Sequence, residues 1–374
     1  MHTPAITGSG VFTPSETITN AELVKAFNNY VDLYNAENAD EIASGTLEAK
    51  AYSSEEFILK SSGIEQRYVI DKTGILDPKV MHPRFAQRKD DEPSLMAEIS
   101  VKAARQALEN AQRNVDEIDL VICAASNMER AYPAIAVEMQ DLLGINGFAF
   151  DMNVACSSAT FGIQAASDMI RSGSVRKALV INPEICSAHL EWRDRDCHFI
   201  FGDVATAVLL EREEDAASSY FQVKSTRCAT VFSNNIRNNN GFLRRTRPAG
   251  MADRRDMQFM QNGRKVFKEV LPMVSAHIAA HMADEGVGAD DLKRLWLHQA
   301  NKTMNDFIGR KVLGRTPEPA EQPNILQDYA NTSSAGSIIA FSKYSNDLAP
   351  GDKGLICSFG AGYSVGSVLV ERKG

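Results

Sequence analysis

The chain has 374 residues, of which 44% are hydrophobic and 24% charged, a composition typical of a globular protein with ample material for a core. Its formal net charge of −8 argues against a general nucleic-acid binder. No apolar run is long enough for a membrane span, and the first residues lack the basic and apolar regions of a signal peptide.

The six cysteines also bear on the class of protein. They stand at positions 123, 156, 186, 197, 228 and 357, and no two of them form a Cys-x-x-Cys pair. This scatter favours reduced thiols over a disulfide framework or a zinc site. We therefore expect a cytoplasmic protein without a bound metal.

The N-terminal part of the chain predicts a strand, a helix and long polar connections. Residues 4–12 have the pattern of a strand, and Thr19 with Glu22 forms the capping-box pattern that starts a helix. From about 28 to 60 the chain is polar and favours helix. Residues 71–93 carry turn residues and mixed charge, so they predict a long loop, which in a compact protein is usually functional or mobile.

Helices and apolar strands then alternate, which is the pattern of an α/β protein. Residues 94–111 have amphipathic helical spacing, and residues 120–125 form an apolar run typical of a buried parallel strand. A second apolar run, 147–150, predicts a buried strand that leads towards Cys156. Small and apolar residues follow at helical spacing over 159–170, so a helix is expected there.

The remainder of the chain continues in the same way. Residues 177–182 and 201–211 predict two more buried strands, and residues 227–262 are irregular in pattern. Residues 266–282 predict a second long helix, and residues 294–298 predict a further buried strand.

The two parts of the chain also resemble each other. In each, a long helix leads through an acidic turn, at 116–118 or 290–292, into an apolar strand, and each ends with Phe-Gly, small residues, an apolar pair and Glu. This degenerate repeat favours an internal duplication into halves of residues 1–212 and 213–374. Two related α/β halves, each on a mostly parallel sheet, are the simplest architecture.

Cys156 lies where a predicted strand meets a predicted helix. Unpaired backbone N–H groups and the positive end of the helix dipole point at a side chain in that position. We expect them to lower the pKa of the thiol and to favour a thiolate nucleophile. Most cysteines are instead structural residues of a core, so position alone leaves both alternatives open.

Two further stretches lie just past strand ends, where α/β proteins place active-site loops. His298 ends the predicted strand 294–298, and Asn331 precedes a run of small residues, 332–337. A cysteine, a histidine and an asparagine on three separate loops could form a nucleophile with two polarising groups. The alternatives are a core histidine bonded to the backbone and an asparagine that caps a helix.

The order of these motifs resembles the β-ketoacyl-[acyl carrier protein] synthase III family of the thiolase superfamily. The resemblance covers nearly the whole chain apart from extra length near 28–50, 71–93 and 230–255. It implies a duplicated fold with a layered α-β-α-β-α core, a homodimer, no metal and no cofactor. The matching segments are Ala155–Ser158, Phe201–Asp203, His298–Asn301, Asn331–Ser334 and Phe359–Gly362, with Gly63, Ile64, Arg67 and residues 263–268 in two more.

The resemblance implies a decarboxylating condensation that starts fatty acid synthesis. Cys156 would take an acyl group from acyl-CoA, and malonyl-acyl carrier protein would then lose CO₂ to give an enolate that attacks this acyl group. His298 and Asn331 would hydrogen-bond the thioester oxygen of the malonyl group. The backbone N–H groups of Cys156 and Ala361 would stabilise the oxyanions that form on the cysteine.

The resemblance also implies substrate-binding residues, namely Phe57, Tyr132 and Asn301. Phe57 stands where the family often has a tryptophan that stacks on the CoA adenine, and Tyr132 where an aromatic side chain of one subunit closes the acyl pocket of the other. Ser61 and Thr303 replace arginines that the family often has nearby. By similarity to the longer branch of the family, we expect a medium-chain acyl-CoA primer of about eight carbons.

Basic residues before and within the second long helix, together with one residue beside Thr303, are candidates for docking the acidic carrier protein. A solvated surface is the ordinary alternative for such a charge cluster. The candidates are Arg244, Arg245, Arg254, Arg255, Arg264, Lys265, Lys268 and Lys302.

The same motifs leave rival functions open. Polyketide-type or quinolone-type condensing enzymes share the Cys-His-Asn set, and a non-decarboxylating acyltransferase of the same fold is a further alternative. His277 and His281 have the spacing of zinc ligands but lack the Glu of H-E-x-x-H, so a structural role is expected. Gly360 and Gly362 do not predict a dinucleotide site, because a strand rather than a helix follows.

Overall fold

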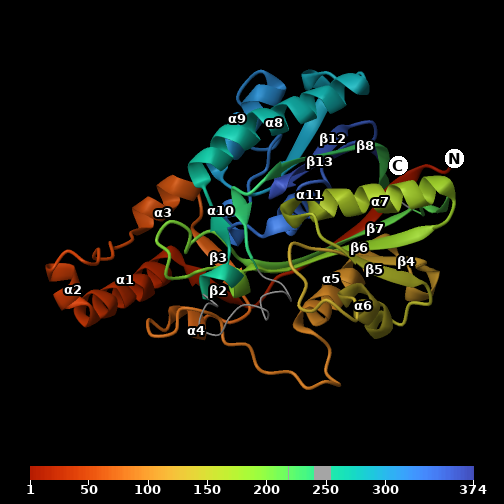
Figure 1. Cartoon of the computed structure of the whole chain (residues 1–374). Helices are drawn as coiled ribbons and strands as arrows, with labels where there is room; N and C mark the ends of the chain where they lie inside the picture. Colours follow the sequence, from red (N-terminus) through yellow and green to blue (C-terminus); the bar gives the residue numbers. More distant parts are fainter. Residues whose placement is uncertain (218, 240–253) are drawn as a thin grey trace.

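The strands join one large mixed sheet in the computed structural model, which describes residues 1–217, 219–239 and 254–374 (Figure 1). Within this part of the chain, nine strands follow the order β11-β12-β13-β8-β1-β7-β6-β4-β5. Their bounds are β1 Pro4–Phe12, β4 Leu120–Ala124, β5 Phe148–Met152, β6 Lys177–Ile185, β7 Asp203–Arg212, β8 Tyr220–Ser233, β11 Leu292–Leu297, β12 Lys353–Gly360 and β13 Gly362–Lys373.

The strands divide by sequence. Those before residue 213 occupy one side of the sheet and those after it the other, and the two sets join where β1 pairs with β8. The division into halves 1–212 and 213–374 fits this order, and the duplication itself stays a prediction. Two short antiparallel pairs lie apart from the large sheet: β2 (Glu16–Thr19) with β3 (Gln66–Val69), and β9 (Ile236–Arg237) with β10 (Met260–Gln261).

Six helices build the layers around the strands: α5 Leu95–Ala111, α6 Ile135–Leu143, α7 Ser158–Ser172, α8 Gly263–Asp284, α9 Lys302–Leu313 and α11 Gly336–Lys343. Helices α7 and α11 contact strands of both halves and therefore form the middle layer. Helix α5 forms one outer layer and packs on β1, β6 and β7, while α8 belongs to the opposite outer layer and packs on β12 and β13 (Figure 1). This is the layered α-β-α-β-α core that the family resemblance implies.

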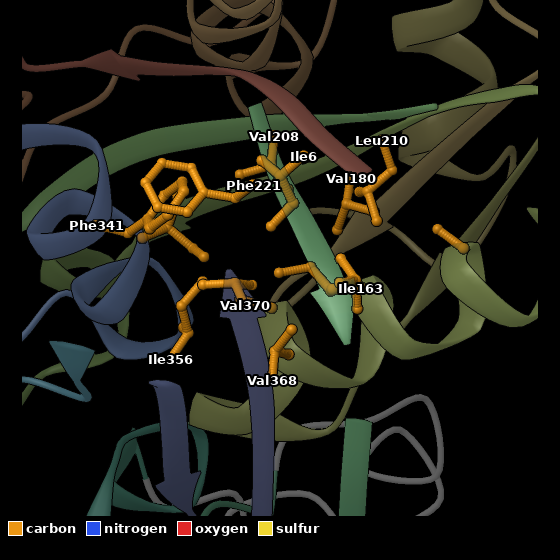
Figure 2. Close-up of a cluster of buried hydrophobic side chains, with 14 of the residues drawn as sticks. Ile6, Ile163, Val180, Val208, Leu210, Phe221, Phe341, Ile356, Val368 and Val370 are labelled. Atoms are coloured by element: carbon orange, nitrogen blue, oxygen red, sulfur yellow. The ribbon is translucent and has the colours of Figure 1, made fainter. Parts of the chain in front are cut away.

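Apolar contacts in the middle layer hold the two halves together. Figure 2 shows Ile163 of α7 and Phe341 of α11 among side chains of one half, including Val180 and Val208, and of the other, including Val368. All five side chains are buried. Each aliphatic side chain buried in this way contributes about 1.5–3 kcal/mol. The core therefore fixes the position of the first turn of α7, next to Cys156.

Close packing of α5 on β1 depends on glycine. The helix begins at Ser94, whose side chain accepts a hydrogen bond from the Ala97 N–H. An added Cβ at Gly10 of β1 would lie 2.1 Å from the carbonyl oxygen of Ala103. The strand can therefore lie directly against the backbone of the helix only where a side chain is absent.

An excursion of three helices projects from one end of the molecule (Figure 1). Its helices are α1 (Asn20–Glu37), α2 (Ala39–Ala43) and α3 (Glu55–Ser62), and we call residues 20–62 the α1 excursion. The fully buried Arg67 joins it to the core, since its guanidinium donates to the Ile18 carbonyl at 3.0 Å and to Asn20 Oδ1 at 2.9 Å. Two short helices, α4 (Thr73–Leu76) and α10 (Leu326–Tyr329), complete the α-helices of the described residues, and short 3-10 turns such as Ala155–Ser157 lie between the elements.

Most sequence-based predictions of elements are confirmed. The capping box is present, since Thr19 Oγ1 accepts from the Glu22 N–H at 3.2 Å and Glu22 Oε2 accepts from the Thr19 N–H at 2.9 Å. The strands expected at 4–12, 120–125 and 177–182 correspond to β1, β4 and β6. No helix in the described ranges is long and apolar enough to cross a membrane.

Four predictions are corrected. The halves are not built on mostly parallel strands, because only the pairs β4–β5, β4–β6 and β11–β12 of the large sheet are parallel and its other pairs are antiparallel. The apolar run at 147–150 is not buried in the single chain, because β5 is an edge strand and Phe148 is 47% exposed. The region 227–262 is not irregular throughout, because β8 continues to Ser233 by pairing along β13. The expected loop at 71–93 contains the short helix α4.

Candidate active site

Cys156 lies on a tight turn between β5 and α7, as predicted. Ala155 adopts a left-handed conformation with φ of 48°, which costs roughly 1–3 kcal/mol for a residue other than glycine. Ser158 fastens the turn, since its Oγ accepts from the Val154 N–H at 2.9 Å and donates to the Ala155 carbonyl at 2.7 Å. This strained turn presents the cysteine towards the loops of the second half.

Three hydrogen-bond donors surround the sulfur. The Ser333 hydroxyl donates to Cys156 Sγ over 3.4 Å, and the backbone N–H groups of Ala361 and of Cys156 itself also point at the sulfur. Gly360 lies directly against the thiol, because an added Cβ there would be 3.0 Å from Sγ. The two backbone donors are the pair that the family resemblance assigns to the oxyanion.

The expectation of a lowered thiol pKa is wrong for this structure. Burial raises the pKa of Cys156 to about 11. The Ser333 hydroxyl and the two backbone N–H groups lower it only in part, and the nearby carboxyl group of Glu184 raises it further. Desolvation therefore affects the pKa of the thiol more than its position at the start of a helix does. The free thiol is protonated at neutral pH.

His298 lies directly after β11, as predicted, and is buried. Its backbone N–H donates to the Cys357 carbonyl at 2.7 Å, and its ring packs edge-on against Phe359 with 5.2 Å between centroids. Burial lowers the pKa of the imidazole to about 4, and the backbone of Ser333 opposes this only in part. The ring is therefore neutral at neutral pH, with one N–H donor and one acceptor nitrogen.

Asn331 is held by its own loop. Its backbone N–H donates to the Ile200 carbonyl at 2.9 Å, and its carbonyl accepts from the Gly202 N–H at 3.1 Å. Its side-chain Oδ1 accepts from the Ser333 N–H at 2.8 Å. Asn331 is not the helix cap that remained an alternative, because Thr332 precedes the short 3-10 turn Ser333–Ala335 and Ala335 is the N-cap of α11. The bond to Ser333 instead turns the amide so that the Nδ2 hydrogens remain for another partner.

The three side chains meet in one cavity of about 590 Å³. Cys156, His298 and Asn331 line its inner part, and Phe57 and Asn301 line it as well. A second cavity, of about 570 Å³, is also lined by Cys156, with Ser333 and Ala361 in its wall. The thiol therefore lies where two cavities meet.

Glu184 is a buried acid beside the site that the sequence reasoning missed. Its carboxylate accepts hydrogen bonds from the N–H groups of Ser126 at 2.9 Å and Ser334 at 3.2 Å, and from both hydroxyls. Burial raises its pKa to about 7, and these donors offset that only in part. Glu184 thereby ties the loop after β4 to the loop of Asn331. An acid inside the apolar strand 177–185 was the available signal.

Arg195 was missed as well. Its guanidinium carbon lies 4.0 Å from the ring centroid of Phe57, and its Nε donates to the Tyr52 carbonyl at 2.7 Å. Phe57 and Arg195 thus form a stacked cation–π pair at the cavity. Arginine next to acidic residues in 191–196 gave no pattern in the sequence that points to this contact.

The other predicted substrate-binding residues differ in position. Asn301 lines the cavity but is also the N-cap of α9, since its Oδ1 accepts from the Thr303 N–H at 2.9 Å. Its Nδ2 donates to the Ser61 carbonyl at 2.6 Å, so its amide is already engaged. Tyr132 is 85% exposed and lines neither cavity of its own chain. A role for Tyr132 in a second subunit stays a prediction.

The predicted docking residues lie near the mouth of the catalytic cavity where the structure describes them. Arg264 lines this cavity, and Lys265 and Lys268 are exposed on the first turns of α8. Lys302 begins α9 and pairs with Asp306 at 2.7 Å. Arg255 is paired with Asp194 at 2.7 Å, while Arg244 and Arg245 lie outside the described residues, as does the side chain of Arg254.

The histidine pair at zinc-like spacing has the structural role that was expected. His277 Nε2 and His281 Nδ1 both contact the Ser367 hydroxyl, at 3.0 and 2.7 Å, and His281 Nε2 contacts the Ser225 hydroxyl at 2.8 Å. Both histidines are buried. They join α8 to strands β8 and β13.

Comparisons with known proteins match both parts of this site. The family model described as 3-oxoacyl-[acyl-carrier-protein] synthase III matches residues 150–227, which include Cys156. The model of the C-terminal part of the same synthase matches residues 282–372, which include His298 and Asn331.

Relatives cover almost the whole chain. It is 55% identical over 350 residues to the beta-ketodecanoyl-[acyl-carrier-protein] synthase of Pseudomonas aeruginosa, covering 93% of this chain and 100% of that protein. It is 33% identical over 330 residues to a beta-ketoacyl-[acyl-carrier-protein] synthase III of Mesorhizobium japonicum, covering 87% and 93%. The crystal structure of 3-oxoacyl-[acyl-carrier-protein] synthase III from Aquifex aeolicus has the same fold, with a TM-score of 0.75 at 24% identity over 98% and 99% of the chains.

Proposed function

The chain belongs to the 3-oxoacyl-[acyl-carrier-protein] synthase III family of acyl-transferring condensing enzymes, and we propose that it joins a medium-chain acyl-CoA to malonyl-acyl carrier protein. The products are CO₂, CoA and a β-ketoacyl carrier protein. The observation that carries this proposal is the single cavity in which Cys156, His298 and Asn331 meet. A nucleophile and two neutral hydrogen-bond donors fit a condensation without a metal ion.

The first half-reaction transfers the acyl group. Cys156 Sγ attacks the thioester carbon, and the negative charge that develops on the carbonyl oxygen is stabilised by the backbone N–H groups of Cys156 and Ala361. The bond to the CoA sulfur then breaks. The thiol proton balances the step, because CoA leaves as a thiol and Cys156 becomes an acyl thioester.

The second half-reaction removes CO₂ and forms a carbon–carbon bond. Malonyl-acyl carrier protein loses its carboxylate, and the electron pair becomes an enolate on the remaining thioester. The ring N–H of His298 and the Nδ2 hydrogens of Asn331 donate to the enolate oxygen. A donor of this kind lowers a barrier by about 3–4 kcal/mol. The enolate carbon attacks the acyl group, and Cys156 leaves as a thiolate that takes up a proton.

The shifted pKa values suit these roles. A neutral His298, with its pKa lowered to about 4, donates a hydrogen bond without charging the cavity. The Cys156 thiol, with its pKa raised to about 11, is a poor nucleophile until a proton acceptor takes its proton as the thioester is attacked.

The length of the primer is the finer part of the proposal. The relative from Pseudomonas aeruginosa is named for a β-ketodecanoyl product, and because condensation adds two carbons, that name corresponds to a primer of about eight carbons. The second cavity at Cys156, of about 570 Å³, offers room beyond the thiol and carries Phe201 and Phe259 in its wall. An aliphatic chain attached to the sulfur would extend into it.

A substrate series tests this. Initial rates are measured with malonyl-acyl carrier protein and acyl-CoA primers from acetyl to decanoyl, and the products are identified by mass spectrometry. We expect the highest kcat/KM with octanoyl-CoA and β-ketodecanoyl carrier protein as its product. Highest activity with acetyl-CoA would overturn the medium-chain primer. Acyl transfer without release of CO₂ would instead support the non-decarboxylating alternative, and repeated condensation would support the polyketide-type one.

We further propose a homodimer that forms at the edge strand β5. Phe148 of β5 is 47% exposed, and Val137 of α6 is 44% exposed. Tyr132, which precedes α6 in the sequence, is 85% exposed. Apolar surface is therefore exposed on and near a strand whose outer edge is unpaired in the single chain. Sedimentation of the purified chain at micromolar concentration should give the mass of a dimer, and Phe148→Glu should give a monomer. The six unpaired cysteines fit a reducing compartment such as the cytoplasm.

A further inference from the structure

In the α1 excursion, the extended segment that leads from α2 to α3 is held by side-chain hydrogen bonds that the condensation chemistry does not use. Two asparagines that lie two turns apart on α1 hold the extended segment before α3. Asn28 Nδ2 donates to the Ser53 carbonyl at 3.1 Å, and its Oδ1 accepts from the Ser53 N–H at 2.9 Å. Asn35 makes the same two bonds with the backbone of Lys50, at 3.1 and 2.9 Å. The backbone of Lys50 is therefore fixed against α1.

Lys50 lines a cavity of about 350 Å³ between α1 and the turn that carries Arg193 and Arg195. Its Nζ lies 4.6 Å from the ring centroid of Tyr34, and the Arg193 guanidinium carbon lies 5.4 Å from that of Tyr30. These aromatic contacts position the cations without neutralising their charge.

The cavity has more positive than negative charge. Four of its lining residues are cationic, and three of them, Lys50, Arg193 and Arg195, make no ion pair with a carboxylate within the described residues. Of its two carboxylates, Asp194 is paired with Arg255 at 2.7 Å, and only Glu191 remains without such a pair. A local excess of positive charge in a chain of net charge −8 points to an anionic ligand.

This cavity adjoins the one that leads to the thiol. Asp194 and Arg255 line both cavities. Arg195, which lines the cationic cavity, stacks on Phe57, which lines the catalytic one. A substrate that reaches Cys156 past Phe57 can therefore place its outer end in the cationic cavity.

We propose that the α1 excursion forms a subsite for the phosphate groups at the nucleotide end of the acyl-CoA primer, with Lys50 and Arg193 as the residues that contact phosphate. The inference rests on the proposed function, because it takes acyl-CoA as the acyl donor. Ammonium and guanidinium groups are the usual protein partners of phosphate, and the neighbouring tyrosine rings offer flat surfaces to a base. The subsite acts when acyl-CoA is bound, in the first half-reaction.

The test compares thioesters that carry different parts of CoA. Acylation of Cys156 is followed with octanoyl-CoA, octanoyl-3′-dephospho-CoA and octanoyl-pantetheine, which lacks the nucleotide. The variants are Lys50→Ala, Lys50→Glu and the matched control Lys25→Ala, which removes an exposed lysine on α1 of the same excursion, outside the cavity. We expect KM for octanoyl-CoA to rise about ten-fold in Lys50→Ala and further in Lys50→Glu, because a charged hydrogen bond is lost.

Kinetic constants that do not depend on the phosphate groups should stay constant. KM for octanoyl-pantetheine and kcat for all three thioesters should match those of the wild type, and the Lys25→Ala variant should not differ from it. Added salt should narrow the difference between wild type and Lys50→Ala for octanoyl-CoA, since the contact is electrostatic. If loss of the 3′-phosphate removes the effect of Lys50→Ala, that phosphate is the group bound; if not, the pyrophosphate is.

Several results would overturn the subsite. These are equal changes in KM for octanoyl-CoA and octanoyl-pantetheine, unchanged kinetics in both Lys50 variants, or a change confined to KM for the malonyl carrier protein, which would assign the cavity to the carrier. If no thioester acylates the wild type, the proposed function fails instead. Calorimetry with CoA alone then decides the subsite: about ten-fold weaker binding to Lys50→Glu than to wild type supports it, and equal or undetectable binding to both refutes it.

Discussion

The catalytic centre and the α1 excursion are both polar assemblies, but they are built in opposite ways. At the centre, Cys156 and His298 come from distant parts of the chain. His298 is buried and Cys156 is partly buried, and desolvation shifts the pKa of both. In the excursion, Asn28 and Asn35 bind backbone only 25 and 15 residues away, and the side chains remain partly exposed.

This difference separates two tasks. The chemistry depends on long-range packing, so small changes at the centre affect every step that passes through Cys156. Recognition at the excursion depends on local hydrogen bonds and on surface charge, so it can change while the centre stays intact. Four predictions, from the largest expected effect to the smallest, sharpen or break this separation.

Loss of either polarising group should have the largest effect. We expect His298→Ala and Asn331→Ala each to lower the rate of CO₂ release from malonyl-acyl carrier protein by about 10²–10³-fold, because a donor to the enolate oxygen is removed. Acylation of Cys156 by octanoyl-CoA should continue in both variants, which intact-protein mass spectrometry can show. Equal loss of acylation and decarboxylation would mean that the two residues do not divide the reaction in this way.

The centre was the part of the molecule most accessible from the sequence. Cys156 and His298 follow the strands β5 and β11, and such strand ends come together at one edge of an α/β sheet. Asn331 was also expected just past a strand, but it follows the short helix α10 instead. Their order matched a family, which fixed the reaction class. The strand and helix pattern fixed the layered fold for the same reason, since periodicity reports which faces are buried.

Properties that depend on contacts across the fold were not accessible. The position of Cys156 at a helix start indicated a lowered pKa, but the sequence does not show how completely the surrounding layers desolvate the sulfur. Glu184 and Arg195 were missed because their partners, among them Ser334 and Phe57, are far away in the sequence. The edge position of β5 was missed because an apolar run has the same sequence pattern in an edge strand as in a strand of the core.

A methyl group at Gly360 tests how closely the centre is packed. An added Cβ there would lie 2.6 Å from the Cβ of Cys156, so backbone or thiol must move. We expect Gly360→Ala to lower the rate of acylation by about ten-fold or more and to destabilise the fold by about 1–3 kcal/mol. Thermal unfolding and acylation rates measure both.

Gly263 provides the matched control for that variant. An added Cβ at Gly263, in the first turn of α8, would meet no atom within 4 Å. Gly263→Ala should therefore leave acylation unchanged. If Gly360→Ala is acylated as fast as Gly263→Ala, the centre is looser than its geometry indicates.

The buried acid should tune the thiol. Because burial raises the pKa of Cys156 to about 11, alkylation by iodoacetamide should speed up as pH rises from 7 towards 11, as the thiolate fraction grows. The carboxylate of Glu184 raises this pKa, so Glu184→Gln should shift the alkylation profile to lower pH. Peptide mass spectrometry, with Cys156→Ala as the background, measures the rate at this cysteine alone. An unmoved profile, or a shift to higher pH, would contradict the electrostatic role of Glu184.

The smallest effect is expected where the excursion is fastened. Asn35→Ala removes both hydrogen bonds to the backbone of Lys50, so we expect KM for octanoyl-CoA to rise a few-fold with unchanged kcat and a loss of about 1 kcal/mol in stability. Asn28→Ala removes the matching pair to Ser53 and should affect KM less, because Lys50 stays in place. A fall in kcat in either variant would show that the excursion and the centre are coupled.

The most direct test of the proposed chemistry follows the acyl group on the intact protein. After incubation with octanoyl-CoA, mass spectrometry should show one octanoyl adduct on Cys156, and addition of malonyl-acyl carrier protein should remove it while CO₂ and β-ketodecanoyl carrier protein appear. The account would be contradicted by an adduct that also forms in Cys156→Ala, or by an adduct on Cys156 that malonyl-acyl carrier protein does not consume.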